Sequence, residues 1–241
     1  MALACCLWEL SGERMSRIYQ ERESTRKYRL PAQRPGPKGG KRDRNRQGRI
    51  QGLCRAGLKL FLASGIEGVT IDDIVGEAGV AKGSFYLYFK DKTELIEAIL
   101  ATMADDLEKT FQECEAGLTS VDSSENVFSV YQVLGARLGE TMFKDVDVTR
   151  LYLQECRAPA VGARKPIALL NQFVDERAVE LSEVAHRHEL LRQIEPKVSA
   201  LAVVGAVEKL LFRTLQAGDL GDPLSVANDM VSLVLDGLRI R

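Results

Sequence analysis

The chain has 241 residues, of which 45% are hydrophobic and 28% charged, and its formal net charge is −1. This is the composition of a globular protein with a substantial core. No apolar run approaches the roughly 20 residues needed to cross a bilayer, so we expect a cytoplasmic protein without a membrane span. The charge is uneven: residues 1–98 carry 18 Lys and Arg against 12 Asp and Glu, whereas residues 99–241 carry 15 against 22. A basic front part favours a polyanionic partner.

The residue types that bind metals or form disulfides show no matching pattern. The five cysteines are odd in number and have neither a disulfide framework nor zinc spacing: Cys5, Cys6, Cys54, Cys114 and Cys156. We expect free thiols, no metal and no cofactor, with a redox-sensing role for Cys114 or Cys156 as the less favoured alternative. His186 and His188 are two residues apart, do not share a helix face, and are expected to be exposed.

Residues 1–46 are expected to form a flexible basic arm. Residues 1–48 contain three of the seven prolines, few large apolar side chains, and 12 Lys and Arg against 5 Asp and Glu. Such a segment buries too little surface to offset its ordering entropy. It is either a solvated tail, with Met15 even as the true start, or an arm that contacts DNA phosphates or the minor groove. The apolar opening run lacks a basic leading segment, so we do not expect a signal peptide.

From about residue 46 the pattern becomes that of amphipathic helices. One apolar stripe at helical spacing consists of Leu53, Ala56, Gly57, Leu60 and Phe61, and Gly65 is the expected end of this helix. Thr70 with Asp73 three residues later has the form of a capping box and predicts the start of a second helix. Gly79 is expected to end that helix.

A short helix over about 82–88 and a longer one after Asp91 are predicted next. Asp91 and Glu94 form the start signal of the longer helix, whose apolar stripe continues to Leu107. The short helix lacks a capping hydroxyl, because its N-cap position is occupied by Ala81. The missing hydroxyl costs about 1 kcal/mol, so this helix is expected to be partly frayed without its partner.

The rest of the chain is also predicted to be helical. Apolar stripes cover about 126–141, 148–156 and 167–191, and the last two helices are expected at about 197–217 and 223–239. Alternation of apolar and polar residues is never sustained, and hairpin signals are missing. The predicted fold class is therefore all-α.

The short turn between the second and third predicted helices is the most informative feature for function. A turn this short makes the two helices cross steeply, as in a helix-turn-helix that reads DNA. The later helix would present Lys82, Gly83 and Ser84, where the donors can reach base edges or phosphates and the glycine leaves room for a groove. Its tyrosines combine an apolar ring with a hydroxyl that reaches a phosphate. Phe85 and Phe89, spaced i and i+4, are expected to face inward.

This segment resembles the DNA-binding domain of tetracycline-repressor-type (TetR) regulators. The matching residues are Leu60-Phe61, Gly65, Thr70, Ala78-Gly79-Val80, Lys82-Gly83, Tyr86, Tyr88-Phe89, Lys92 and Leu95. Ala81 departs from the pattern, because the family usually has Ser or Thr there. The resemblance implies a three-helix DNA-binding domain over residues 47–107, with the helix-turn-helix at about 70–89. It implies contacts to palindromic double-stranded operator DNA from Thr70, Lys82, Gly83, Ser84, Tyr86, Tyr88 and Lys92.

For residues 108–241 the resemblance implies a larger helical domain for effector binding and dimerisation. Homodimers would form through the last two helices, and the preceding helices, between about 108 and 192, would enclose a pocket for an unknown small molecule. Candidate lining residues are Phe128, Tyr131, Arg150, Tyr152 and Phe173. Each of them is alternatively an ordinary core or surface residue.

The sequence thus predicts a DNA-binding transcriptional regulator, most simply a repressor released from its operator by a small-molecule effector. No pairing of nucleophile and base and no phosphate-cradling loop occurs, so we do not expect an enzyme. The alternative is a helical ligand-binding or interaction module that keeps the fold without binding an operator.

Overall fold

The computed structural model describes residues 40–119, 124–187, 189 and 194–217, together with residues 226, 229 and 233; the side chains of residues 41–43, 124–128 and 217 lie outside this description. The helices in chain order are α2 (Lys41–Gly68), α3 (Ile71–Glu77), α4 (Lys82–Tyr86), α5 (Lys92–Thr119), α6 (Ser124–Lys144), α7 (Val146–Glu155), the short 3₁₀ helix η1 (Gly162–Arg164), α8 (Lys165–Arg187) and α9 (Pro196–Ala217). No strand occurs in these ranges. The predicted all-α fold is confirmed.

The chain divides into two compact units, Met1–Arg49 and Ile50–Arg241. Of the first unit, residues 1–39, which include most of the predicted arm, lie outside the described residues. Helix α2 begins at Lys41, earlier than the predicted start near residue 46. The last residues assigned to the arm are therefore helical.

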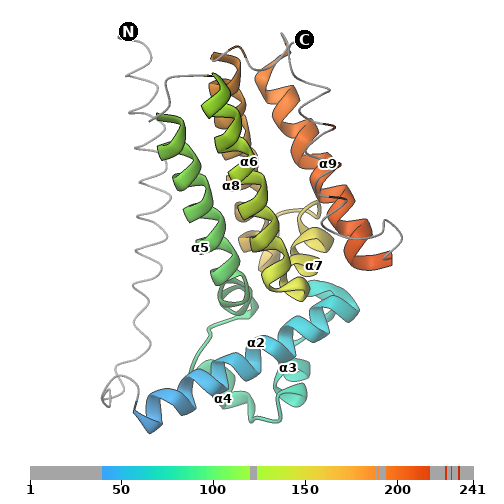
Figure 1. The fold of residues 1–241 in the computed structure, drawn as a ribbon. Helices are drawn as coiled ribbons and strands as arrows, with labels where there is room; N and C mark the ends of the chain where they lie inside the picture. Colours follow the sequence, from blue (N-terminus) through green and yellow to red (C-terminus); the bar gives the residue numbers. More distant parts are fainter. Residues whose placement is uncertain are drawn as a thin grey trace. The chain divides into compact units, whose positions relative to one another are not determined.

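The second unit contains α2 from Ile50 onward and the helices from α3 to α9. Helices α5, α6 and α8 run alongside one another, and α9 packs against α8 and α7 (Figure 1). Helices α3 and α4 precede α5 and contact each other. Helix α5 is continuous across residue 107, where sequence analysis placed a domain boundary, and so leads directly from the helix-turn-helix into the larger helical part.

Two groups of fully buried side chains lie along these helices. The first group comes from α2 to α5 and consists of Leu53, Phe61, Ile66, Ile74, Phe85, Leu95 and Ile96. The second comes from α5, α7 and α8 and includes Leu107, Leu151, Ile167 and Leu170. Phe111 and Phe173 meet edge to face beside it, with ring centroids 5.7 Å apart. Burial of each such side chain contributes about 1.5–3 kcal/mol, so both groups stabilise the fold substantially.

The predicted helix ends agree with the structure except at a few positions. Gly65, the predicted end of the first helix, interrupts α2 with φ of 72°, a left-handed conformation that glycine adopts without strain, and α2 then continues to Gly68.

His186 is half-buried, with Nδ1 2.7 Å from the carbonyl oxygen of Ser182, and is not exposed as predicted. The reason is that this face of α8 packs on α9, where the hydroxyls of Ser182 and Ser199 lie 2.7 Å apart.

The predicted last helix, about 223–239, lies mostly outside the described residues. The described positions 226, 229 and 233 are helical. His188 also lies outside them. No helix in the described part of the chain combines the length and apolar character needed to span a membrane.

Candidate nucleic-acid interface

The start of α3 is fixed by a reciprocal cap between Thr70 and Asp73. The Asp73 amide donates to the Thr70 hydroxyl oxygen at 3.2 Å, while the amide and hydroxyl of Thr70 donate to the Asp73 carboxylate at 2.8 and 2.6 Å. These hydrogen bonds lower the pKa of Asp73 below its usual value. The predicted capping box is confirmed, and it places Thr70 at the N-terminus of α3.

The turn after α3 is fixed by its backbone. Gly79 has φ of 65°, and its amide donates to Gly76 O at 3.2 Å while the Val80 amide donates to Val75 O at 3.0 Å. This pair of bonds is the Schellman motif that ends a helix with a left-handed residue. Helix α4 begins only three residues after Gly79, so the turn is as tight as a helix-turn-helix requires.

Helix α4 is short and starts without a side-chain cap. The N-cap is Ala81, no side chain caps the helix there, and the Ser84 amide donates to the Ala81 carbonyl at 2.8 Å. The helix ends at Tyr86 and not near residue 88 as predicted. Phe85 and Phe89 are buried, which confirms their inward orientation. These two rings hold α4 against the rest of the unit.

The predicted DNA-contacting residues in and just after α4 differ in their exposure. Lys82 and Gly83 are exposed, Tyr86 is 52% exposed, and Ser84 and Tyr88 are half-buried. A Cβ placed on Gly83 would meet no atom within 4 Å, so the space above the backbone is free for a ligand. Sequence analysis missed Leu87, which is 47% exposed between the two tyrosines. An exposed apolar side chain here can contact the methyl group of thymine.

Lys82 already has an anionic partner in the free protein. Its Nζ lies 2.8 Å from Asp72 Oδ2, and this bond and the Asp72 charge raise the pKa of Lys82. Both side chains are more than half exposed, so the pair contributes little to stability. A phosphate can therefore replace Asp72 as the partner of the ammonium at little cost.

Lys92, the first residue of α5, makes hydrogen bonds within the protein. Its Nζ donates to the backbone carbonyls of Ile66 at 2.8 Å and Val69 at 2.7 Å. These carbonyls belong to the end of α2 and the segment after it, where the helix leaves acceptors unsatisfied. The ammonium thus fixes the end of α2 to the start of α5. This task is separate from the DNA contact expected of Lys92.

A second joint connects the end of α2 to the larger helical part, and sequence analysis did not find it. Arg164 Nε donates to Glu155 Oε2 at 2.7 Å, and its Nη1 lies 3.5 Å from Glu67 Oε1. The Glu155 side chain is 6% exposed, so this charge depends on its partner. Gln154 adds a donor to the carbonyl of Phe61 at 3.4 Å. The end of α7 and η1 are thereby attached to α2.

The five predicted effector residues are spread over the larger helical part. Tyr131 donates to the Leu181 carbonyl at 2.6 Å, and Phe173 packs on Phe111. Arg150 is half-exposed, with Nη1 3.5 Å from Asp147. The remaining two are Tyr152, which is buried in a polar cluster of α7, α8 and α9, and Phe128, whose side chain lies outside the described residues.

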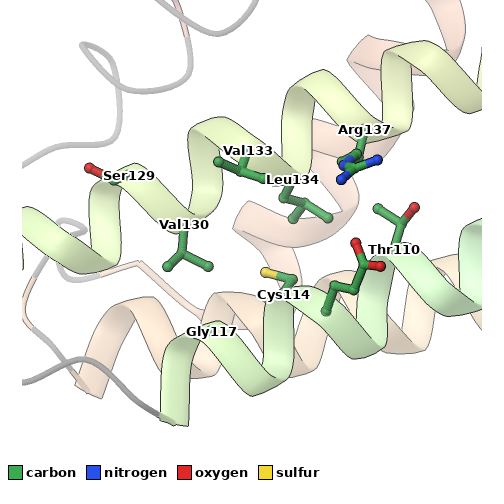
Figure 2. A pocket seen from close by; sticks show the side chains of 9 residues that line it. Thr110, Cys114, Gly117, Ser129, Val130, Val133, Leu134 and Arg137 are labelled. Carbon is green, nitrogen blue, oxygen red and sulfur yellow. The ribbon is translucent and has the colours of Figure 1, made fainter.

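A pocket of about 240 Å³ lies elsewhere, between α5 and α6 (Figure 2). It is lined by Thr110, Glu113, Cys114, Gly117, Ser129, Val130, Val133, Leu134 and Arg137. None of the four predicted effector residues whose side chains are described lines it. Cys114 lies on its α5 wall, and burial raises the pKa of this thiol to about 11. The thiol is therefore neutral, and the pocket is mainly apolar.

Comparison with known proteins identifies the helix-turn-helix segment. The family model described as "Bacterial regulatory proteins, tetR family" matches residues 53–99. The HTH-type transcriptional regulator SrpR of Pseudomonas putida is 38% identical over 61 residues, which cover 25% of this chain and 29% of SrpR. YdgC of Bacillus subtilis (strain 168), an uncharacterised HTH-type transcriptional regulator, is 26% identical over 192 residues, which cover 77% of this chain and 90% of YdgC.

The fold is also shared with solved structures. The crystal structure of NalD, the secondary repressor of the MexAB-OprM multidrug efflux pump in Pseudomonas aeruginosa, aligns with a TM-score of 0.64 and 18% identity. The alignment covers 81% of this chain and 98% of NalD. At this identity the likeness shows the fold, including the larger helical part beyond the family match.

Proposed function

The chain belongs to the TetR family of helix-turn-helix regulators, and from that premise we propose that it represses transcription as a cytoplasmic homodimer that binds operator DNA through α4. The family is one of regulators and not of enzymes, in agreement with the sequence analysis. The observation that carries the proposal is the construction of α4. The buried ring of Phe85 and the following Phe89 fix it in place, while Lys82, Tyr86 and Leu87 stay exposed.

The reading surface in this proposal has two kinds of contact. Lys82, Gly83, Ser84 and the exposed Leu87 enter the major groove, where donors and apolar groups distinguish base edges. Tyr86 and Tyr88 flank them and contact the phosphate backbone through their hydroxyl groups.

The helix starts supply further phosphate contacts. Thr70 at the N-terminus of α3 and Lys92 at the N-terminus of α5 lie at helix starts, where the helix dipole favours an anion. Because the Lys92 ammonium is held by two carbonyls, we expect its backbone amide to contribute more than its side chain.

Dimerisation is proposed through α9 and the helix after it. Apolar side chains occur along α9 on all sides, yet in the described part of this helix only Ser199 and Ala200 are buried. Leu201 and Val198 are strongly exposed. A two-fold axis across this surface would bury it and place two copies of α4 on successive half-sites of a palindrome.

Release by a small molecule is proposed through the larger helical part, with Phe128, Tyr131, Arg150, Tyr152 and Phe173 as candidate effector contacts. Helix α5 and the joint between Arg164 and Glu67 connect this part to the DNA-reading helices. An effector releases the operator only if it binds the released conformation more tightly than the DNA-bound one.

The experiment measures binding of the full chain to a fluorescent duplex from the region upstream of its own gene. We expect K82A and Y86A each to weaken binding about ten- to a hundredfold. K109A is the matched control, because Lys109 is an exposed lysine of α5 paired only within its own helix, and it should bind as the wild type does. Sedimentation must show that all variants remain dimers. Wild-type affinity in K82A and Y86A would refute the assigned surface, and wild-type failure to bind would favour the interaction module.

A further inference from the structure

A cluster of polar side chains joins α7, α8 and α9. The Tyr152 hydroxyl oxygen lies 3.0 Å from Asn171 Oδ1 and 3.1 Å from Glu208 Oε1. The amide nitrogen of Asn171 lies 3.1 Å from Asp175 Oδ2. Tyr152 is only 3% exposed and the Glu208 side chain 13%. In each of these contacts one of the two polar atoms must donate a hydrogen, because a buried polar group without a hydrogen bond is costly.

Counting protons shows that the cluster lacks one if both carboxylates are ionised. A tyrosine hydroxyl carries one proton, while an amide oxygen and a carboxylate only accept. The Tyr152 hydroxyl can therefore donate to Asn171 Oδ1 or to Glu208 Oε1, but not to both. Rotating the Asn171 amide by half a turn lets its nitrogen donate to Tyr152, but its oxygen then faces the Asp175 carboxylate. Either orientation leaves two acceptors facing each other.

One additional proton satisfies every contact in two ways. On Glu208 it is donated to the Tyr152 oxygen, Tyr152 donates to Asn171, and Asn171 donates to Asp175. On Asp175 it is donated to the rotated Asn171 amide, Asn171 donates to Tyr152, and Tyr152 donates to Glu208. The amide orientation follows the proton, because Asn oxygen and nitrogen are assigned from the network.

We propose that Asp175 and Glu208 share one proton through Asn171 and Tyr152 in the folded protein, and that loss of this proton as the pH rises loosens the packing of α9 against α7 and α8. The cluster is thus a pH-sensitive joint at the helix that carries Glu208. The proposal concerns this joint alone and does not depend on DNA binding.

The surrounding charges favour Asp175 as the main site of the proton. Arg157, which follows α7, has Nη2 3.3 Å from Glu208 Oε2, so a positive charge lies beside Glu208. Asp175 faces no described cation; burial first, then the charges of Glu208 and of Glu176 on its own helix, raise its pKa. The shared proton therefore resides mainly on Asp175.

Two further titratable groups near the cluster, Tyr152 itself and Cys156 at the C-cap of α7, stay neutral and supply no negative charge. Burial, together with nearby negative charges, raises the pKa of Tyr152. Burial raises the pKa of the Cys156 thiol to about 11. Neither group therefore competes with the carboxyl groups of the cluster for the additional proton.

The sign of the pH effect follows from linkage. A carboxyl whose pKa is raised by folding binds a proton that the unfolded chain, with an Asp value near 3.8, has released. The stability from this proton is present at low pH and is lost as the pH rises through the folded pKa. An amide in place of either carboxyl supplies the missing donor at every pH.

The test compares the melting temperatures of the full chain and its D175N and E208Q variants between pH 4 and pH 9. We expect the melting temperature of each variant, minus that of the wild type, to increase with pH and to reach several degrees at the alkaline end. E183Q is the matched control, because Glu183 is an exposed carboxylate of the same helix, eight residues beyond Asp175 and outside the contacts of the cluster. Its difference from the wild type should not change with pH. Loss of the Arg157 pair in E208Q has little effect, since Arg157 is 66% exposed.

A difference for D175N that is constant or becomes more negative with rising pH would overturn the proposal, because ionised Asp175 would then be stabilising. A second measurement does not depend on the variants folding well. Carbon-13 NMR should show the Asp175 carboxyl group, assigned in the wild-type spectrum, titrating above its ordinary range. Titration of Asp175 in or below that range would also overturn the proposal.

Discussion

Replacing Ala81 by serine should stabilise the protein, because α4 starts without a side-chain cap. Ala81 has φ −70° and ψ 147°, the extended conformation that N-cap residues adopt, and it is exposed, so a serine hydroxyl fits without a backbone change. A capping hydroxyl contributes about 1 kcal/mol. Phe85 is completely buried, so α4 unfolds together with the core and the gain counts toward global stability. For a unit of this size the melting temperature should rise by about 2–4 °C.

Differential scanning calorimetry measures this shift, and A78S is the matched control. Ala78 is the C-cap of α3 with a helical backbone, where a new hydroxyl finds no free amide. We expect A78S to change stability by less than about 0.5 kcal/mol. An unchanged or lower melting temperature in A81S, with A78S near the wild type, would show that α4 does not start at Lys82.

Three further predictions concern the joint, the core and the cap. R164M should lower the free energy of unfolding by about 3–5 kcal/mol in urea titrations, because it leaves the Glu155 charge buried without its partner; a loss under 1 kcal/mol would contradict this. F85A should cost about 3–5 kcal/mol in the same titrations, whereas Y86A, at an exposed ring, should cost far less; equal losses would count against the assigned orientation of α4. Carbon-13 NMR should place the pKa of Asp73 below 3.8. The cap then stabilises α3 above pH 3.8 and weakens as the pH falls through the lowered pKa. T70V should move the pKa of Asp73 back up, and an unchanged pKa in T70V would refute the cap.

The helix-turn-helix could be predicted from the sequence because its determinants are local. Thr70 and Asp73 are three residues apart, Gly79 ends α3 by its own backbone, and Phe85 and Phe89 lie one turn apart. Each signal depends on residues within one turn of the chain. The exception is the end of α4 at Tyr86, because apolar spacing does not distinguish a helical turn from the turn that follows it.

The polar joints could not be predicted because their partners are distant in sequence. Arg164 contacts Glu67, nearly a hundred residues earlier, and Glu208 contacts Tyr152 from another helix. Nothing in the pattern around these residues distinguishes them from surface charges. For the same reason, sequence analysis identified Tyr152 as a candidate effector contact but not the acidic cluster around it.

Footprinting of the full chain on DNA from the region upstream of its own gene tests the central claim most directly. The account predicts protection of a palindrome with two half-sites about one helical turn apart, bound by two chains and lost in K82A and Y86A. Protection of a single unpaired site, or equal protection by both variants, would contradict a dimer that reads DNA through α4.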